Sequence, residues 1–212
     1  MTFSAIAVSP DRARIGIASA SYSLAVGRSV QAIAPGVGGI ITQAWTNRRF
    51  RARGLELLRA GLDPDEVIRT FQQEDADFAS RQVAVMTPDG SAAHWTGPET
   101  TPWGGALAGE NYTVIGNLLP GPAVLDEMAH AIEERRGKPL AELLFEALLA
   151  GQRAGGDRRG QQSATIVIAN NSEADVAPPE LEIDLRCDDS PAPLIELERM
   201  LQIQHAQSLA GA

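Results

Sequence analysis

Cysteine and histidine are scarce in this sequence, and their scarcity excludes several kinds of site. Cys187 is the only cysteine, so the chain can form neither an internal disulfide nor a metal site built from several thiolates. The three histidines, His94, His130 and His205, lie far apart in the sequence without the spacing of metal ligands. We therefore predict no metal site and no cofactor.

The sequence also lacks a long apolar run and an excess of positive charge. No stretch of about 18 apolar residues is present, and no basic region followed by an apolar stretch opens the chain. We therefore expect a cytoplasmic protein with no membrane partner. The formal net charge is −9, whereas nucleic-acid binding depends on neutralising phosphates with Lys and Arg. We therefore expect no nucleic acid as a partner.

What the sequence does contain is typical of a globular protein. Of its 212 residues, 44% are hydrophobic and 21% are charged, which argues against wholesale disorder. This length suffices for one sizeable core, and no internal repeat or separate linker divides the chain. We therefore predict a single domain over residues 1–212.

Hydrophobic patterns predict groups of strands that alternate with groups of helices. Alternating or nearly continuous apolar residues predict strands, whereas apolar residues at helical spacing predict helices, several of them opened by Asp or Pro. The predicted strands are 1–8, 15–20, 30–34, 39–44, 82–86, 91–96, 112–116, 163–169 and 181–187. The predicted helices begin near residues 48, 64, 122, 139 and 193, and the segment around Trp103 is predicted to be a loop.

This order of elements indicates the fold class. Strands joined as hairpins between pairs of helices suggest two mainly antiparallel sheets that stack face to face, with helices outside. We therefore predict an α+β protein with a four-layer α/β/β/α sandwich. A doubly wound sheet is not favoured, because single strands and single helices would then alternate.

The first residues of the chain offer a reactive group that needs no partner from elsewhere. A small residue, Thr2, follows Met1, so removal of the initiator methionine is expected to leave Thr2 with both a hydroxyl and a free α-amine. Such an amine titrates near pH ~8, so its neutral fraction can accept the hydroxyl proton as the oxygen attacks an acyl carbon. The alternative is that this segment is only an opening edge strand.

Several segments together resemble one bacterial family, the domain-of-unknown-function family one thousand and twenty-eight (DUF1028), which is grouped with the N-terminal-nucleophile hydrolases. The resemblance runs through nearly the whole chain, and residues 155–163, Gly-Gly-Asp-Arg-Arg-Gly-Gln-Gln-Ser, are its most specific part. The other segments are 2–4, 42–44 with Asn47, 54–58 and 116–119. The resemblance implies the same four-layer sandwich, and it implies amide-bond hydrolysis only by analogy with the superfamily.

Polar residues near the strand ends are candidates for the chemistry around Thr2. Asn117 could offer an N–H group to a developing oxyanion, or it could cap the turn that follows. Ser19 and Ser21 lie near the end of the strand expected beside the first one, where they could hydrogen-bond the α-amine and tune its pKa. Small polar residues are also common in strands, so both roles stay open for the two serines.

Substrate contacts are expected from two other segments. Gln43 and Asn47 lie where polar groups crowd the end of a strand. Asp157 and Arg158 could bind or orient the substrate, with the guanidinium clamping a carboxylate, or an Asp–Arg pair could hold a tight loop together. Gln162 enters the next strand, where its side chain could face the nucleophile.

These residues predict an amidohydrolase of the N-terminal-nucleophile type that acts on a small amide or an acylated amino-acid-like compound. Thr2 is the predicted nucleophile and base, and Asn117 is predicted to hold the oxyanion. We also expect a homo-oligomer, because sandwiches of this type commonly associate through their outer helices. The alternative function is a catalytically inactive binding or assembly module. A serine hydrolase based on Ser19 or Ser21 has less support, because no Gly-x-Ser-x-Gly turn is present.

Overall fold

The strands of the computed structural model form two antiparallel sheets within the described residues, 2–173 and 180–210. Their bounds are β1 (Thr2–Val8), β2 (Arg14–Ser21), β3 (Gln31–Ala34), β4 (Gly38–Ala44), β5 (Arg81–Met86), β6 (Ala92–Thr96), β7 (Gly105–Gly109), β8 (Tyr112–Asn117), β9 (Ser163–Asn170) and β10 (Ile183–Cys187). One sheet has the order β10-β9-β2-β1-β8-β7 and the other has the order β3-β4-β5-β6. Neighbouring strands are antiparallel, which confirms two antiparallel sheets in an α+β protein.

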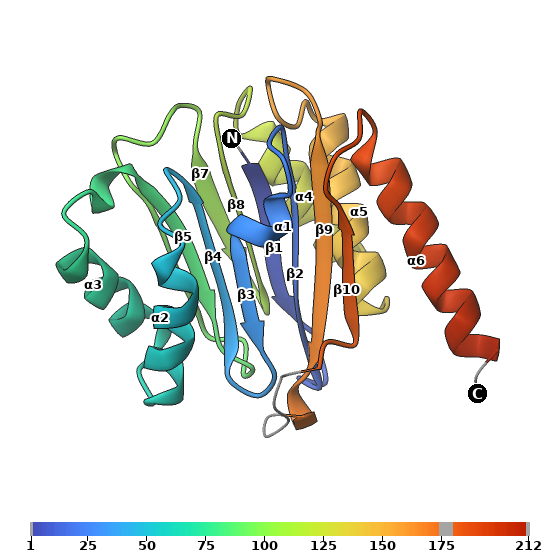
Figure 1. Cartoon of the computed structure of the whole chain (residues 1–212), viewed down its shortest axis with the longest axis horizontal. Helices are drawn as coiled ribbons and strands as arrows, with labels where there is room; N and C mark the ends of the chain where they lie inside the picture. The colour runs from blue at the N-terminus through green and yellow to red at the C-terminus, as the bar shows by residue number, and fades with distance from the viewer. Residues whose placement is uncertain (1, 174–179, 211–212) are drawn as a thin grey trace.

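Helices other than the short first one pack against the outer faces of the two sheets. Their bounds are α1 (Val26–Ser29), α2 (Arg49–Arg59), α3 (Pro64–Glu74), α4 (Ala123–Glu134), α5 (Leu140–Arg153) and α6 (Pro193–Ala210). Helices α2 and α3 contact the four-stranded sheet, whereas α4, α5 and α6 contact the six-stranded sheet on the opposite side of the molecule (Figure 1). Within the described residues, no helix combines the length and the apolar composition that a membrane crossing requires.

Strand β1 lies at the centre of the larger sheet, between β2 and β8. All seven of its residues are buried, because both faces of the strand are covered. Successive side chains point to opposite faces, so Phe3 and Ala5 pack in the cluster that α4 and α5 cover, whereas Ile6 and Val8 pack against the smaller sheet. Thr2, the predicted nucleophile at the start of this strand, therefore lies on a strand that is buried along its whole length.

Helix α3 shows how local signals fix an element where the sequence predicted it. The Asp63 carboxylate accepts the backbone N–H of Glu66 at 2.7 Å, and the Glu66 carboxylate accepts the backbone N–H of Asp63 at 2.9 Å. This reciprocal capping box satisfies amides that the first helical turn leaves unpaired. Val67 and Phe71 are then 0% exposed, which anchors the helix on the smaller sheet.

Two elements differ from the prediction. Gly105–Gly109 was expected to belong to the loop around Trp103, but it forms β7 and pairs with β8. Its Gly and Ala residues have weak strand propensity, so only the pairing with β8 and the packing of the Tyr112 ring on Gly109 identify it as a strand. The short helix α1 after β2 was also not predicted.

The layer between the two sheets changes character along its length. At one end, which we call the apolar end, the facing strands contribute Ile6, Val8, Ile15, Ile17, Ile41, Ala84, Met86, Ile115, Val167 and Ala169. At the other end, which we call the polar end, the same strands and β3 contribute Thr2, Ser4, Ser19, Ser21, Gln31, Gln43, Gln82, Asn117 and Thr165. Every residue of the polar end is buried. The start of β1 lies at this end, beside the loop that leads into β9 (Figure 1).

Candidate functional site

Thr2 lies at the polar end, between two residues that the sequence had singled out. It pairs with Ser21 of β2 on one side and with Asn117 of β8 on the other. Residues directly opposite each other in a sheet share one face, so all three side chains point into the inter-sheet layer. Thr2 is 5% exposed, and its Oγ1 donates a hydrogen bond to Ser21 Oγ at 3.1 Å.

Gln82 of β5, which the sequence analysis did not single out, is the centre of the contacts around Asn117. Its Nε2 donates to the carbonyl oxygens of Gly116 at 2.8 Å and Gly105 at 3.1 Å. Carbonyl oxygens only accept hydrogen bonds, so they fix which end of the Gln82 amide is nitrogen. Gln82 Oε1 must therefore accept, and Asn117 donates to it through Nδ2 at 2.9 Å. Among the described residues, the other Nδ2 hydrogen of Asn117 has no acceptor.

Gln43 links this centre to β1. Its Nε2 donates to Gln82 Oε1 at 2.8 Å and to the backbone carbonyl of Thr2 at 3.3 Å. Its Oε1 accepts the hydroxyl of Ser4 at 2.8 Å, and Ser4 Oγ lies 2.8 Å from Ser19 Oγ. Gln43 was predicted to contact substrate; in the structure it is 0% exposed, and its hydrogen bonds go to Thr2, Ser4 and Gln82. Ser19 likewise contacts Ser4 rather than Thr2.

All the side chains of the polar end are uncharged, being hydroxyls and amides only. Gln31 adds a hydrogen bond from its Nε2 to Thr165 Oγ1 at 3.2 Å, while its buried Oε1 has no partner among the described residues. A buried neutral polar group is tolerated when it is hydrogen-bonded. The site can therefore hold a reactive group away from water without a buried charge of its own.

Asp157 lies beside the polar end, and its carboxylate binds groups of its own loop and of the segment after β2. Asp157 Oδ2 accepts the backbone N–H of Tyr22 at 2.7 Å, and Oδ1 accepts that of Arg159 at 2.8 Å. Arg159 Nη2 also pairs with Oδ2 at 3.0 Å. These contacts match the loop-holding alternative, with Arg159 as the partner of Asp157. Arg158 lies exposed on the same loop.

Two further predicted residues lie near this end of the sheets but bind elsewhere. Gln162 donates its backbone N–H to Ser21 O at 3.0 Å, whereas its side chain reaches Asp189 Oδ1 at 3.1 Å. Asn47 donates from Nδ2 to Asp75 Oδ2 at 2.7 Å. None of these side-chain contacts joins Gln162 or Asn47 to Thr2.

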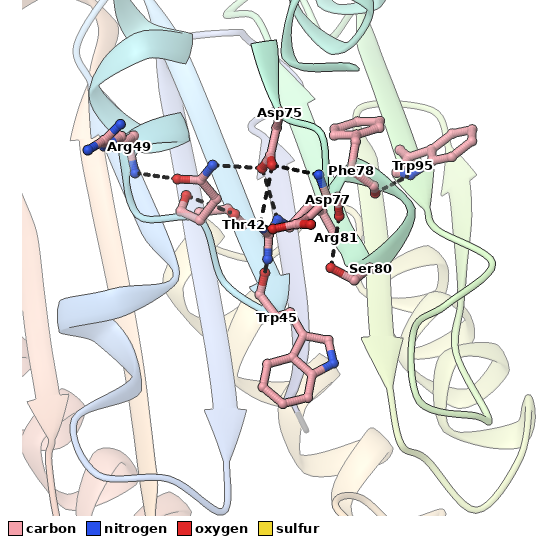
Figure 2. A network of polar contacts seen from close by, with 10 residues as sticks. Thr42, Trp45, Arg49, Asp75, Asp77, Phe78, Ser80, Arg81 and Trp95 are labelled. Carbon is pink, nitrogen blue, oxygen red and sulfur yellow. Dashed lines mark hydrogen bonds and ion pairs between the residues drawn. The ribbon is translucent and has the colours of Figure 1, made fainter. Parts of the chain in front are cut away.

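The contacts of Asn47 belong to a separate network on the outer side of β5, drawn in Figure 2. Arg81 Nε donates to Asp75 Oδ2 at 2.9 Å, and its Nη1 donates to the carbonyl of Trp45 at 2.7 Å. The hydrogen bond from Arg81 lowers the pKa of the Asp75 carboxyl, helped by Asn47 and opposed by burial. The side chains of Arg81 and Asp75 are only 15% and 9% exposed, so this pair fixes the loop after β4.

Neither of two cavities in the described part of the chain is lined by Thr2. One of about 180 Å³ lies at the other end of β1, against Val8 and Leu143, and one of about 400 Å³ lies between β10 and α6. Met1, whose removal the sequence predicts, is outside the described residues. Across residues 2–173 and 180–210, no group of three or more His, Cys, Asp or Glu side chains is arranged to hold a metal ion.

Comparison with known proteins gives one family and a solved structure that is similar over most of its length. A model of DUF1028, a family of unknown function, matches residues 2–197. The crystal structure of protein SPO2555 from Silicibacter pomeroyi, assigned to the same family model, is 30% identical with a TM-score of 0.85, over 95% of this chain and 88% of that one.

A more distant structure was also found. The Anbu (ancestral beta-subunit) protein from Yersinia bercovieri is 13% identical with a TM-score of 0.44, over 100% of this chain and 98% of that one. This likeness is too weak to support an inference. No curated protein matches the chain.

Proposed function

We propose that this chain, which belongs to the DUF1028 family of unknown function, is an N-terminal-nucleophile amidohydrolase for a small amide or an acylated amino-acid-like compound. In this proposal, the two sheets and their outer helices are the four-layer α/β/β/α sandwich of that superfamily. Thr2 becomes the nucleophile after Met1 has been removed. The polar end of the inter-sheet layer then serves as the active site.

One observation carries the proposal: Thr2 stands in register between Ser21 and Asn117 on the inter-sheet face. The three polar side chains lie next to one another on neighbouring strands. The α-amine of Thr2, once Met1 is removed, would lie beside them. Gln82 of the facing sheet accepts a hydrogen bond from Asn117 Nδ2, which holds the Asn117 amide in one orientation. An oxyanion needs donors that are fixed before the reaction begins.

The chemistry proceeds by acyl transfer to Thr2 and then to water. The α-amine accepts the proton of Oγ1 as this oxygen forms a bond to the substrate carbonyl carbon, whose oxygen becomes negatively charged. The free N–H of Asn117 donates to that oxygen. The amine then returns the proton to the leaving nitrogen as the C–N bond breaks, which leaves an ester on Thr2. Water hydrolyses this ester by the same steps, with the α-amine again serving as base.

The decisive variant is Thr2→Val, which keeps the branched shape of Thr2 and removes only its hydroxyl. The purified wild-type protein and this variant would be screened against a library of small amides, with intact mass spectrometry to record whether Met1 is present. We expect amide hydrolysis by the wild type and a loss of about a thousandfold or more in the variant, as is typical when a nucleophile is removed. Thr2→Ser, which retains a hydroxyl, should retain activity. Equal rates in wild type and Thr2→Val would contradict the proposal.

The rival function is a catalytically inactive binding or assembly module, and the burial of the site favours it. Thr2 is 5% exposed and Asn117 is 2% exposed, and neither cavity described above reaches them. A module of this kind would keep Met1 and would hydrolyse no amide in the same screen. Removal of Met1 together with activity that depends on Thr2 would exclude it.

A further inference from the structure

We infer that Trp45 and Tyr22 form an aromatic rim at the entrance to the Thr2 site, and that the substrate carries a flat, apolar acyl group which stacks on Trp45. This inference rests on the function proposed above and names its substrate class. It predicts that benzoyl-type or other aryl amides are bound in preference to acetyl amides.

The first observation is where large apolar side chains are exposed. Across the described residues, six such side chains are exposed: Tyr22, Leu24, Trp45, Leu107, Ile195 and Ile203. Scattered exposed apolar residues are normal on a protein surface, but three of these follow strands that contact Thr2. Tyr22 comes directly after Ser21 and Leu24 three residues after it, and Trp45 comes two residues after Gln43. Three of the six exposed apolar side chains therefore follow strands that border Thr2.

The second observation is that the backbone of Trp45 is fixed by a hydrogen bond, whereas its ring is exposed to solvent. The backbone turns at Ala44, whose φ of 63° is in the left-handed region, and Arg81 Nη1 donates to the Trp45 carbonyl at 2.7 Å. Figure 2 shows the indole pointing away from the Arg81–Asp75 contacts. Trp45 is 65% exposed. A fixed backbone limits the positions that the ring can take, so a ligand that stacks on the ring need not also order this segment of the chain.

Tyr22 is held in a comparable way on the other side of Thr2. Its backbone N–H donates to Asp157 Oδ2 at 2.7 Å, and the guanidinium carbon of Arg159 lies 5.4 Å from the centre of its ring. Tyr22 is 44% exposed. The two aromatic residues therefore come from different sheets, one from the strand beside β1 and one from the strand that faces it.

Chain connectivity keeps both residues close to the reactive group. Consecutive Cα atoms are about 3.8 Å apart, so the Trp45 Cα lies within about 7.6 Å of the Gln43 Cα, and Gln43 Nε2 is 3.3 Å from Thr2 O. An indole prefers stacked or edge-on contact with another flat ring. In the inferred arrangement, an aryl group on the acyl carbon attacked by Thr2 reaches this rim.

The test uses N-benzoylglycine and N-acetylglycine, which differ only in the acyl group. Binding would be measured by calorimetry or ligand-observed NMR in the Thr2→Val background, where no turnover occurs. We expect tighter binding of the benzoyl compound. Trp45→Ala should weaken its binding about threefold to tenfold and leave the acetyl compound unchanged. Leu107→Ala, which removes an exposed aliphatic side chain from edge strand β7, is the matched control and should change neither.

A second variant distinguishes the contribution of the Trp45 ring from that of the hydrogen bond that fixes its backbone. Arg81→Met keeps the indole but removes the hydrogen bond to the Trp45 carbonyl, so it should weaken benzoyl binding partially. Trp45→Phe should restore most of what Trp45→Ala loses, because phenylalanine still offers a ring face.

The outcomes distinguish this inference from the proposed function. Equal binding of the two compounds, no measurable binding of either, or no effect of Trp45→Ala would overturn the aromatic rim, while hydrolysis that depends on Thr2 could still be observed. If instead the benzoyl compound binds through Trp45 but no amide is hydrolysed by the wild type, the aromatic rim stands and the proposed hydrolase fails.

Discussion

The two ends of the inter-sheet layer are equally closed to solvent but are built from different chemistry. At the apolar end, Ile6 and Ile17 are 0% exposed and both lie against Gly39 of the facing sheet. At the polar end, Ser4, Gln43 and Gln82 are also 0% exposed, but they are joined by hydrogen bonds. Burial alone therefore does not explain why the two ends differ.

The difference indicates what each end contributes. Burying an apolar side chain of this size stabilises the fold by about 1.5–3 kcal/mol, whereas a typical buried hydrogen bond contributes about 0.5–1.5 kcal/mol. Apolar side chains throughout the layer would therefore give the more stable protein. The polar end is found where β1 begins, which is where the chemistry proposed for Thr2 would need hydroxyls and amides.

The largest expected effect on stability comes from breaking the apolar end. Ile17→Ala should lower the free energy of unfolding by about 2–5 kcal/mol, because it removes buried methyl groups and leaves a cavity between the sheets. Chemical denaturation would measure this loss. Amidase activity per folded molecule should stay near the wild-type value, since Ile17 contacts none of the hydrogen-bonded groups. A parallel collapse of activity in the folded fraction would show that the two ends are not independent.

Breaking the polar end at Gln82 should cost less stability and more activity. Gln82→Leu leaves the Gly116 carbonyl and the amides of Asn117 and Gln43 without their partner, which should lower the free energy of unfolding by about 1–3 kcal/mol. The Asn117 side chain would also lose its fixed orientation, so activity should fall in the folded protein. Thr96→Val, which removes only one acceptor of Gln82 Nε2, is the control and should retain activity. An active Gln82→Leu variant would contradict the assigned role of Gln82.

The Arg81–Asp75 ion pair on the outer side of β5 offers a contrast with the uncharged polar end, because its contribution to stability depends on pH. Hydrogen bonds from Arg81 and Asn47 lower the pKa of Asp75 below its unfolded value of about 3.9. Its stabilisation is therefore fully present above that pH and is lost as the pH falls through the folded pKa. Wild type should exceed Asp75→Asn by about 1 kcal/mol in unfolding free energy at pH 7.

Denaturation curves at several pH values would measure this difference, which should shrink below about pH 4 as the carboxyl takes up its proton. Asp77→Asn is the matched control, because the Asp77 side chain is 79% exposed and exposed ion pairs contribute little. A difference between wild type and Asp75→Asn that stays constant from pH 7 to acid would contradict the role of this charge.

The smallest expected effect comes from a polar residue at the apolar end. Thr113 pairs with Ile6 and is 0% exposed, and its hydroxyl has no partner among the described residues. Thr113→Val should therefore raise the free energy of unfolding by about 1 kcal/mol. Thr165→Val at the polar end removes a hydroxyl that accepts a hydrogen bond from Gln31, so it should lower stability instead. Thermal unfolding of both variants would show whether the signs are opposite.

Most elements of the fold could be predicted from local sequence, and those that could not depend on distant pairing. Asp63 and Pro64 predict the start of α3 from a short local signal, and the helix begins at Pro64. The apolar run 163–169 predicts β9 in the same way. Strand β7, in contrast, is Gly-Ala-Leu-Ala-Gly, which has no strand pattern of its own. Only its neighbour β8 makes it a strand.

The site was predictable in its residue types but not in its contacts. Register between distant strands, which sequence does not reveal, brings Thr2, Ser21 and Asn117 together. Gln82 was missed because a single Gln at the start of an apolar strand looks like an exposed end. The available signal was its position two residues before Ala84, since residues two apart in a strand share one face and Ala84 is buried in the core. For Asn47, the sequence does not reveal that its side chain donates to Asp75, 28 residues away.

The most direct test of the central claim is the intact mass of the protein purified from cells, measured together with its rate of amide hydrolysis. We predict a chain shortened by Met1, with an activity that rises in proportion to the shortened fraction and is absent in Thr2→Val. Preparations that retain Met1 throughout and hydrolyse amides equally well would contradict the account, because Thr2 would then have no free amine to act as base.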